Sequence, residues 1–245
     1  VRCMVEIPDL ERMLLVEQNS PQFNVYSLDM VMQHHHRFDE ESHPGMYIID
    51  VVYLYRLRML AISGSDHVIH LLAEQLSTSG HHKCYTVHER CLNESLQVKL
   101  AWCPENYRLM SVDPANNMHV WSMEPETFEE NAPPHRVHST HRPHKDVITD
   151  VLYIKDRGLI ASSSLDKKIV LWGLDNMRER GVLLGHALGI RKMAYANGTL
   201  ISVGFEYDAI VWDITSKAQS LLLRGHRCSI ASVRILAVHR EHTLK

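Results

Sequence analysis

An internal repeat constrains the fold of this chain more than any other feature. Residues 50–72 and residues 150–172 align without a gap at an offset of 100. The identities at corresponding places are Asp50 with Asp150, Tyr53 with Tyr153, Ala61 with Ala161 and Asp66 with Asp166. Each copy reads as an apolar strand, a charged turn, a second strand, a turn containing Asp and a third strand. A repeat of this kind predicts an architecture built from stacked supersecondary units.

Weaker copies extend the repeat along most of the 245 residues. The predicted third strands close at Tyr26, Leu72, Trp121, Trp172 and Trp212. Successive closing residues are 46, 49, 51 and 40 positions apart, which is near the ~40–45-residue period of a four-stranded propeller blade. Apolar runs such as Ile169–Trp172 favour strands buried on both faces, and Asn197-Gly198 favours a hairpin turn. We therefore predict an all-β fold.

These segments resemble the WD40 family. Leu184-Gly185-His186 and Arg224-Gly225-His226 look like the Gly-His dipeptide of that family, and Trp212-Asp213 looks like its closing pair. The similarity is strongest over 144–232, fair over 45–121 and weak over 1–44. The resemblance implies a WD40 β-propeller of which 1–245 covers about five to six blades. We expect a first blade without its opening strands, a partial blade at 226–245, and a larger seven-blade or tandem propeller that supplies the remainder.

The resemblance also implies a buried structural tetrad in one blade, formed by His144, Ser162, Asp166 and Trp172. A weaker structural set comprises His186, Ser202 and Trp212, with Glu206 or Asp208 at the acidic position. Ser, His and Asp together could instead indicate a hydrolase triad. The sequence contains no G-x-S-x-G elbow, no phosphate-binding loop and no G-x-G-x-x-G. We therefore predict a protein that is not an enzyme, with no catalytic residues and no cofactor.

Histidine is abundant, with 18 residues, which raises the question of metal binding. One run is His34-His35-His36, and a second places histidines at 135, 138, 141 and 144. Structural zinc sites usually need four fixed ligands including Cys, and both stretches are typical of solvated loops between blades. We predict no metal site. The five cysteines, Cys3, Cys84, Cys91, Cys103 and Cys228, form no C-x-x-C pair and indicate reduced thiols in the cytoplasm.

A further implication of the family resemblance concerns partner binding. In WD40 proteins the residue before the turn acid of each blade points toward one propeller face. Those residues here are Ser65, Pro114, Leu165 and Phe205. Exposed Leu and Phe side chains on adjacent blades could anchor a partner, or they could pack on neighbouring loops.

Charge and a narrower resemblance indicate the class of function. The net charge is −3, and no apolar run reaches the ~18 residues of a membrane span, so neither nucleic acid nor a membrane is expected as a partner. Residues 203–235 resemble the large WD-repeat proteins of cilia and flagella, some of which carry EF-hands. This resemblance implies a non-catalytic scaffold of the axonemal cytoskeleton whose partners are doublet-microtubule proteins, tubulin among them. The alternative is a substrate receptor or adaptor of a ubiquitin ligase or other cytoplasmic complex, although Thr215 stands where that class often carries Arg.

Overall fold

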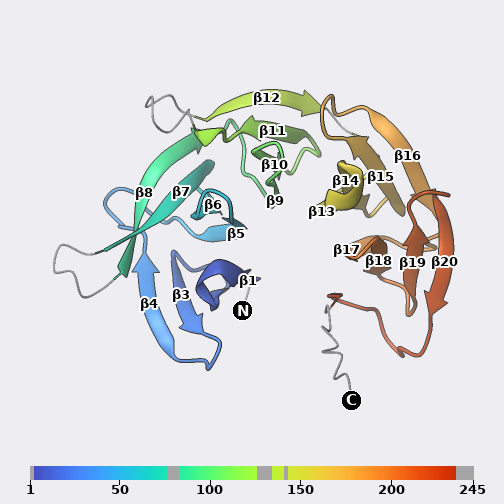
Figure 1. Cartoon of the computed structure of the whole chain (residues 1–245), viewed down its shortest axis with the longest axis horizontal. Helices are drawn as coiled ribbons and strands as arrows, with labels where there is room; N and C mark the ends of the chain where they lie inside the picture. Colours follow the sequence, from blue (N-terminus) through green and yellow to red (C-terminus); the bar gives the residue numbers. More distant parts are fainter. Residues whose placement is uncertain (1–2, 77–82, 126–133, 141–142, 236–245) are drawn as a thin grey trace, which may run out of the picture. The chain divides into compact units, whose positions relative to one another are not determined.

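The computed structural model describes residues 3–76, 83–125, 134–140 and 143–235. In this part of the chain, strands form five four-stranded antiparallel sheets, each a meander of four strands in chain order (Figure 1). The predicted fold class, all-β with WD40-type propeller blades, is confirmed. The contacts divide the chain into two compact units, Val1–Pro143 and His144–Lys245, which are described separately.

The first unit holds three blades, named A, B and C. Blade A comprises β1 (Cys3–Ile7), β2 (Arg12–Val16), β3 (Gln22–Ser27) and β4 (Met32–Arg37). Blade B comprises β5 (Ile48–Leu54), β6 (Met59–Gly64), β7 (Val68–Leu76) and β8 (Lys83–Leu92). Blade C comprises β9 (Lys99–Cys103), β10 (Arg108–Val112), β11 (Met118–Ser122) and β12 (His135–Thr140). A short 3-10 helix, Pro8–Leu10, joins β1 to β2.

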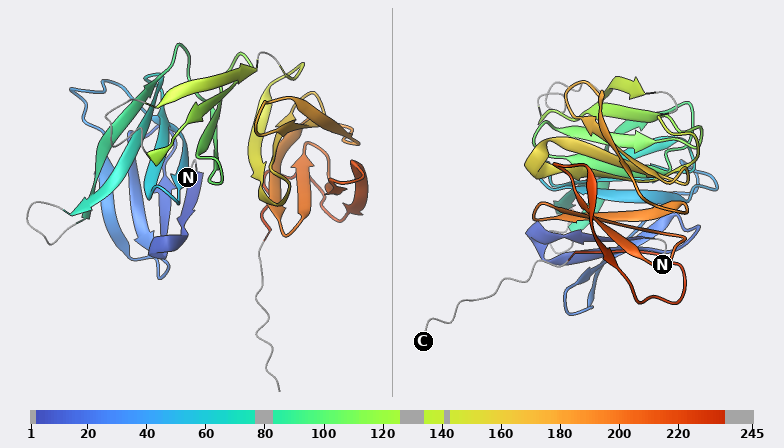
Figure 2. Two further views of the ribbon diagram at one scale, coloured as in Figure 1. Left: turned by 45° about the horizontal axis from the view of Figure 1, so that its top comes forward. Right: turned by 90° about the vertical axis from the view of Figure 1, so that its right-hand side faces the viewer.

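The second unit holds two blades, named D and E. Blade D comprises β13 (Ile148–Ile154), β14 (Leu159–Ser164), β15 (Lys168–Gly173) and β16 (Glu179–Leu184). Blade E comprises β17 (Ile190–Ala196), β18 (Thr199–Gly204), β19 (Ala209–Asp213) and β20 (Ala218–Leu223). A 3-10 turn, Lys155–Arg157, joins β13 to β14, and Gly158 follows it with φ +59°. Figure 2 shows the strong twist of the individual sheets, as expected for strands of L-residues.

The third and fourth strands of each blade pair through a β-bulge at the same place, where the fourth strand has one extra residue opposite the step into the closing residue. The register shifts fall between Val25/Tyr26, Leu71/Leu72, Val120/Trp121, Leu171/Trp172 and Val211/Trp212. A bulge adds one residue to one strand and turns the following side chain to a new direction. The five closing residues therefore occupy equivalent positions, although two of them are not Trp.

The hydrophobic core lies between neighbouring blades of one unit. One cluster joins blades A and B through residues such as Leu14, Phe23 and Leu60, and a second joins B and C around Trp102 and Trp121. In the second unit, a cluster containing Leu171 and Trp212 joins D and E. Inner strands such as β6, β11, β14 and β15 are buried on both faces for this reason, which accounts for their continuous apolar runs.

Two expectations about the ends of the repeat array need revision. Blade A was predicted to lack its opening strands, and that prediction is wrong because β1 and β2 are both present. The predicted partial blade at 226–245 is described only as far as residue 235, and its described part contains no strand. Ile230 in that part donates its backbone N–H to the Gly204 carbonyl, 3.1 Å away, and is buried against blade E.

Candidate functional site

Blade D brings His144, Ser162, Asp166 and Trp172 together in one hydrogen-bonded chain. The Trp172 Nε1–H donates to Ser162 Oγ at 2.8 Å, and His144 Nε2 lies 2.7 Å from the same oxygen. His144 Nδ1 lies 3.1 Å from Asp166 Oδ2, which also accepts the Lys145 backbone N–H. Because the carboxylate accepts from Nδ1, the ring accepts the Ser162 proton at Nε2. The chain ties the loop before β13 to β14 and β15.

Electrostatics and burial in blade D favour a structural role for this chain. Burial lowers the pKa of His144, an effect that the nearby Asp166 carboxylate partly opposes. Burial would raise the pKa of Asp166, but hydrogen bonds from Lys145 N–H and His144 hold it below its usual value. Ser162 is completely buried, so its hydroxyl cannot reach a substrate. A triad needs an accessible nucleophile, which this serine is not.

Blade E builds the same chain with a glutamate as its acid. Trp212 Nε1–H donates to Ser202 Oγ at 2.7 Å, and the His186 ring bonds the same hydroxyl. Glu206 Oε1 lies 2.8 Å from His186 Nδ1 and accepts the Leu188 N–H at 2.9 Å. The sequence left open whether Glu206 or Asp208 takes this position, and Glu206 does. Asp208 instead lies 3.8 Å from the Arg224 side chain.

Blade C satisfies its acid differently, with a histidine from the third strand. Asp113 accepts from Asn117 N–H and Nδ2–H at 2.9 and 2.8 Å, and His119 Nε2 lies 3.3 Å from it. Ser95, from the loop before β9, donates to the same carboxylate at 3.3 Å. Sequence reasoning missed this arrangement because Asp113 stands two residues after the serine of its blade, Ser111, rather than four.

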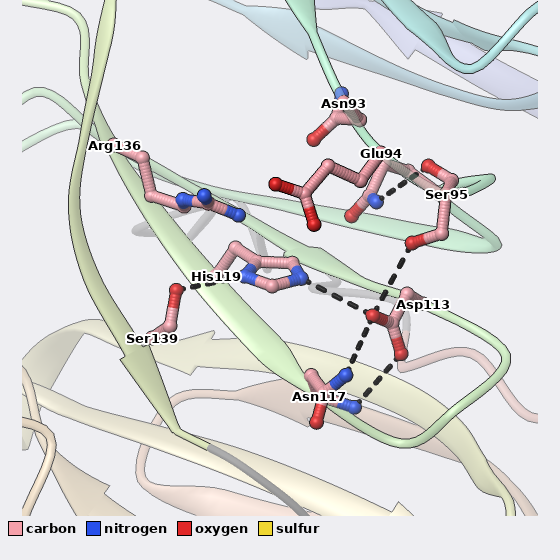
Figure 3. Close-up of a pocket in the computed structure, with 9 residues that line it drawn as sticks. Asn93, Glu94, Ser95, Asp113, Asn117, His119, Arg136 and Ser139 are labelled. Carbon is pink, nitrogen blue, oxygen red and sulfur yellow. Dashed lines mark hydrogen bonds and ion pairs between the residues drawn. The ribbon is translucent and has the colours of Figure 1, made fainter.

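A polar pocket of about 210 Å³ opens beside Asp113 and His119 (Figure 3). Its lining residues are Asn93, Glu94, Ser95, Gln97, Asp113, Asn117, His119, Arg136 and Ser139. The side-chain oxygens of Asn93 and Gln97 are buried without a hydrogen-bond partner, whereas their amide nitrogens donate to backbone carbonyls. The pocket is polar and large enough for water, which we expect to satisfy these two oxygens.

Three side chains beside the pocket follow the order of a hydrolase triad: Ser139, His119 and Asp113. Ser139 Oγ lies 2.9 Å from His119 Nδ1, and His119 Nε2 lies 3.3 Å from Asp113 Oδ2. The β11–β12 register places Ser139 directly opposite His119, so the contact follows from cross-strand pairing. Acyl transfer also needs preorganised donors aimed at the developing oxyanion. Arg136, the one arginine in the lining, lies instead over the Trp121 ring at 5.9 Å.

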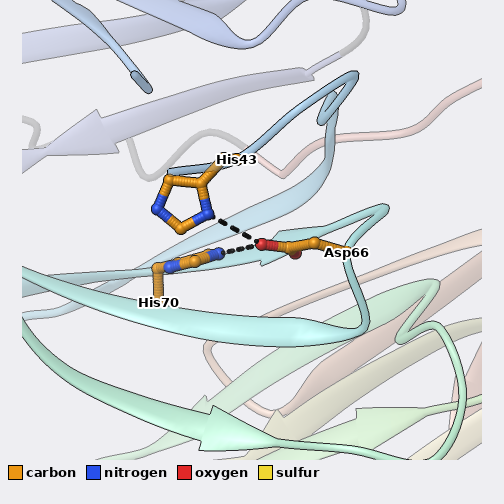
Figure 4. Close-up of side chains that lie close together, drawn as sticks. All are labelled: His43, Asp66 and His70. Atoms are coloured by element: carbon orange, nitrogen blue, oxygen red, sulfur yellow. Dashed lines mark hydrogen bonds and ion pairs between the residues drawn. The ribbon is translucent and has the colours of Figure 1, made fainter. Parts of the chain in front are cut away.

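Blade B holds a third variant, in which two histidines face one carboxylate (Figure 4). His43 Nδ1 lies 3.2 Å and His70 Nε2 lies 2.8 Å from Asp66 Oδ2. The ring of Phe38 contacts both imidazoles, with centroid distances of 5.6 and 5.0 Å. Blade B has Ile62 and Leu72 where blade D has the serine and tryptophan of its chain. The sequence comparison could have found this site, since Asp66 aligns with Asp166.

The predicted partner-face residues fall into two groups. Ser65, Leu165 and Phe205 occupy equivalent places, because each donates its backbone N–H to the chain just before the first strand of its own blade. Pro114 departs from this pattern, since it follows the acid Asp113 and has no N–H to donate. Phe205 is 40% exposed, whereas the Ser65 hydroxyl accepts the Tyr47 N–H at 2.9 Å.

The first histidine run and the start of the second lie in strands rather than in loops, so their predicted placement is wrong, whereas His144 does lie in a loop. His34, His35 and His36 belong to β4, and His135 and His138 belong to β12. His36 stacks on Phe23 with a centroid distance of 5.0 Å. Burial, together with the charges of His34 and His35, lowers its pKa to about 4. His81, His82 and His141 lie outside the described residues.

A pair of interblade clamps was not assigned any role from the sequence. Asp50 in β5 accepts the Leu100 N–H at 2.8 Å and bonds Lys99 Nζ at 3.1 Å, both in β9 of the next blade. Asp150 in β13 repeats this contact on β17, where it accepts the Met193 N–H at 3.0 Å and Lys192 Nζ at 2.9 Å. The alignment of Asp50 with Asp150 was the available signal.

Comparisons with known proteins agree on the fold and give a limited indication of biology. No family model matches the chain. A chain in the crystal structure of a mitotic checkpoint complex matches with a TM-score of 0.68 and 12% identity, over 91% of this chain and 65% of that one. This likeness shows the fold alone.

Among curated proteins, Cilia- and flagella-associated protein 337 B of Tetrahymena thermophila is 23% identical over 139 residues. The match covers 56% of this chain and 10% of the relative, so the chain spans only a small part of that protein. Among the described residues, no helix has the length and apolarity to cross a membrane.

Proposed function

We propose that this chain is part of a non-catalytic scaffold that binds other proteins in the axoneme of cilia or flagella, in association with doublet microtubules. The similarity to a cilia- and flagella-associated protein supports the location. The blade architecture supports the mode of action, since rigid sheets present loops in a fixed arrangement and binding resides in those loops. The partners are axonemal proteins, with tubulin among them.

The observation that carries this proposal is a group of exposed apolar side chains on the loops of the second unit. Its exposed members are Val147, Leu188, Phe205 and Tyr207, and we call these four side chains together with the half-buried Leu165 the DE face. Val147, Leu188 and Tyr207 are 45%, 47% and 58% exposed. Within blade D the Leu165 N–H donates to the Val147 carbonyl, and within blade E the Phe205 N–H donates to the Gly189 carbonyl, so each bond joins two loops at the start of one blade.

The DE face is anchored well enough to act as a docking surface. The Arg191 guanidinium lies 4.0 Å from the Phe205 ring centroid, which fixes the ring and places a cation beside it. Leu165 packs against Gly189, where a Cβ would come within 2.9 Å of Leu165 Cδ2. Rigid aromatic and aliphatic anchors bind with little loss of side-chain entropy, which suits a protein contact.

We propose no catalytic step, cofactor, nucleic acid or membrane partner for this function. The serines of the blade D and E chains, Ser162 and Ser202, are fully buried. The net charge of −3 provides no basic surface for nucleic acid. A static scaffold gains residence time from several moderate contacts rather than from one deep pocket.

Fractionation of cilia from cells expressing the tagged full-length protein tests the location. We expect the protein to remain with the doublets after membrane and soluble matrix are removed, and to resist moderate salt because its charge is nearly balanced. Recovery in the soluble matrix, or no enrichment in cilia, would overturn the axonemal role. Co-purification with a cullin complex would instead favour the ubiquitin-ligase alternative.

A double substitution tests the surface. Leu165→Asp with Phe205→Asp should release the protein from the doublets without unfolding it, because two charges replace apolar anchors on the DE face. Leu223→Asp is the matched control, since Leu223 is also 40% exposed but lies on β20. Equal retention of both variants would rule out the DE face as the docking surface.

A further inference from the structure

Blade B is the one blade, among the described residues, in which two histidine side chains converge on a single acid. In blades D and E the histidine that bonds the acid comes from the loop before the blade. The third-strand position two residues before the closing tryptophan is occupied there by Val170 and Ile210, which are apolar. Blade C uses the third-strand His119 instead. In blade B both places are filled, by His43 and His70. One histidine already satisfies the acid in each of the other three blades, so the second is not required for that purpose.

The second histidine is also not explained by the hydrogen-bonded chain of blades D and E, which we call the relay. In blades D and E the imidazole and the indole N–H of the tryptophan both hydrogen-bond to the hydroxyl of one serine. Blade B has replaced these two members by Ile62 and Leu72, which cannot form hydrogen bonds. The blade has therefore lost the relay while it gained an imidazole.

The three side chains have the chemistry and spacing of metal ligands. His43 Nδ1, Asp66 Oδ2 and His70 Nε2 all lie within 4.8 Å of one another. The two nitrogens are 3.2 and 2.8 Å from the oxygen. Ligands at ~2.0–2.2 Å from a tetrahedral zinc ion are themselves roughly 3.3 Å apart, so small movements would complete the set.

The surroundings hold these ligands in place and leave one position open. The Val68 backbone N–H donates to Asp66 Oδ1 at 3.3 Å, which leaves Oδ2 directed at the two rings. Gly64 makes room for the carboxylate, because a Cβ there would collide with Asp66 Oδ1. The side chain of Asp66 is 21% exposed, whereas those of His43 and His70 are 8% and 0% exposed, so solvent reaches the cluster mainly at the carboxylate. Two histidines, one carboxylate and a water make up the open type of zinc site.

We propose that His43, Asp66 and His70 bind one Zn²⁺ ion, with water as the fourth ligand. In the metal-bound form His43 Nδ1 and His70 Nε2 bind the ion through their lone pairs, and the single proton of each neutral ring lies on the other nitrogen, His43 Nε2 or His70 Nδ1. Imidazole and carboxylate ligands favour zinc over calcium and magnesium, which prefer all-oxygen sites.

Titration of the purified full chain with Zn²⁺ against a chromophoric chelator tests the site. His70→Val is the informative variant because blade D carries Val170 at the equivalent position, so the substitution is compatible with the fold. We expect one tight ion per wild-type chain and an affinity at least about 100-fold lower in His70→Val. His138→Ala, which removes an exposed histidine on β12, is the control and should leave the affinity unchanged.

Cobalt substitution provides a readout that surface histidines cannot mimic. Co²⁺ in a four-coordinate site gives intense visible absorption, whereas loosely bound hydrated Co²⁺ does not. The band should appear in the wild type and in His138→Ala and be absent in His70→Val. A missing band in the wild type, or equal zinc affinity in His70→Val and wild type with a normal thermal melt for the variant, would overturn the proposal.

Discussion

At the scale of single residues, the structure shows how one buried hydroxyl can organise a blade. Ser162 Oγ accepts the Trp172 indole N–H and donates to His144, so the loss of any member leaves a buried polar atom unpaired. Asp166 stabilises the far end of the chain, because it accepts from the imidazole and from the Lys145 and Lys168 backbone N–H groups. The energetic importance of these residues comes from burial rather than from reactivity.

Asp166→Ala should therefore lower the free energy of unfolding by about 2–4 kcal/mol, since it strands a buried imidazole and two backbone donors. Urea denaturation of the full chain followed by tryptophan fluorescence measures this loss. Asp175→Ala, at an exposed position, is the control and should change stability by no more than about 0.5 kcal/mol. A loss for Asp166→Ala as small as that of the control would mean that the chain contributes nothing to the fold.

Acidification should destabilise the protein as the pH falls below 6.5. The pKa values of His36, His144 and His186 are all lowered by burial in the folded state, so the unfolded chain takes up protons first. Their stabilising effect is complete above the unfolded value of 6.5 and is lost as pH falls through the folded pKa, about 4 for His36. The lowered pKa of Asp166 adds a further loss only below 3.8.

Urea unfolding at about pH 7.5 and about pH 5.5 checks this sign. The free energy of unfolding should be lower at the acidic pH. His36→Phe, which keeps a ring stacked on Phe23 but cannot titrate, should show a smaller drop than the wild type. Equal drops in the two proteins would show that His36 is not a neutral buried group in the folded state.

At the scale of elements, each interblade clamp combines an ion pair with a hydrogen bond from a backbone N–H, and these two contacts contribute unequally to stability. Asp150 is buried and accepts the Met193 backbone N–H, whereas the Lys192 side chain is 36% exposed. A half-exposed ion pair contributes little, but a buried carboxylate bonded to backbone fixes the register of two sheets.

Lys192→Met should for that reason cost less than about 1 kcal/mol, and Asp150→Ala should cost about 2–3 kcal/mol. Thermal denaturation of the two variants ranks these losses. The reverse ranking would show that the ion pair, and not the backbone contact, holds blade D to blade E.

The sequence was informative about elements whose side chains are buried and poor about those whose side chains face solvent. Third strands such as Ile169–Trp172 were predictable because burial on both faces imposes a continuous apolar run. The outer strands β4 and β12 were missed because their alternation is filled by histidine, arginine and serine, which resemble a polar loop. The arrangement in blade C was missed because His119, two residues before the closing position, replaces the loop histidine, and no motif signals that exchange. Blade B keeps the loop histidine His43 and adds His70, and the alignment of Asp66 with Asp166 was the available signal.

At the scale of the whole molecule, the chain divides into two compact units, and each interblade clamp joins two blades of the same unit. Asp50 belongs to the unit Val1–Pro143 and Asp150 to the unit His144–Lys245. Local stability should therefore respond to substitution unit by unit.

Hydrogen–deuterium exchange of the full chain tests this expectation. Asp50→Ala should accelerate amide exchange in blades B and C and leave blades D and E close to the wild type. Asp150→Ala should produce the converse pattern and serves as the matched comparison. Uniform acceleration over all five blades in either variant would show that the two units open together.

The clamps also bear on how the chain is made. The acid lies on the earlier blade in both cases, and the backbone N–H that donates to it follows 50 residues after Asp50 and 43 residues after Asp150. Blade B ends at Leu92, so its last strand leaves the ribosome before Leu100, by about one second at a synthesis rate of ~5–20 residues per second. Finished blades B and D then each offer a carboxylate that selects the next nascent strand in one register and one direction. These two blade pairs therefore have a built-in order of assembly, from the N-terminus toward the C-terminus, and exchanging the order of blades within a pair would leave its acid without the backbone N–H that it binds.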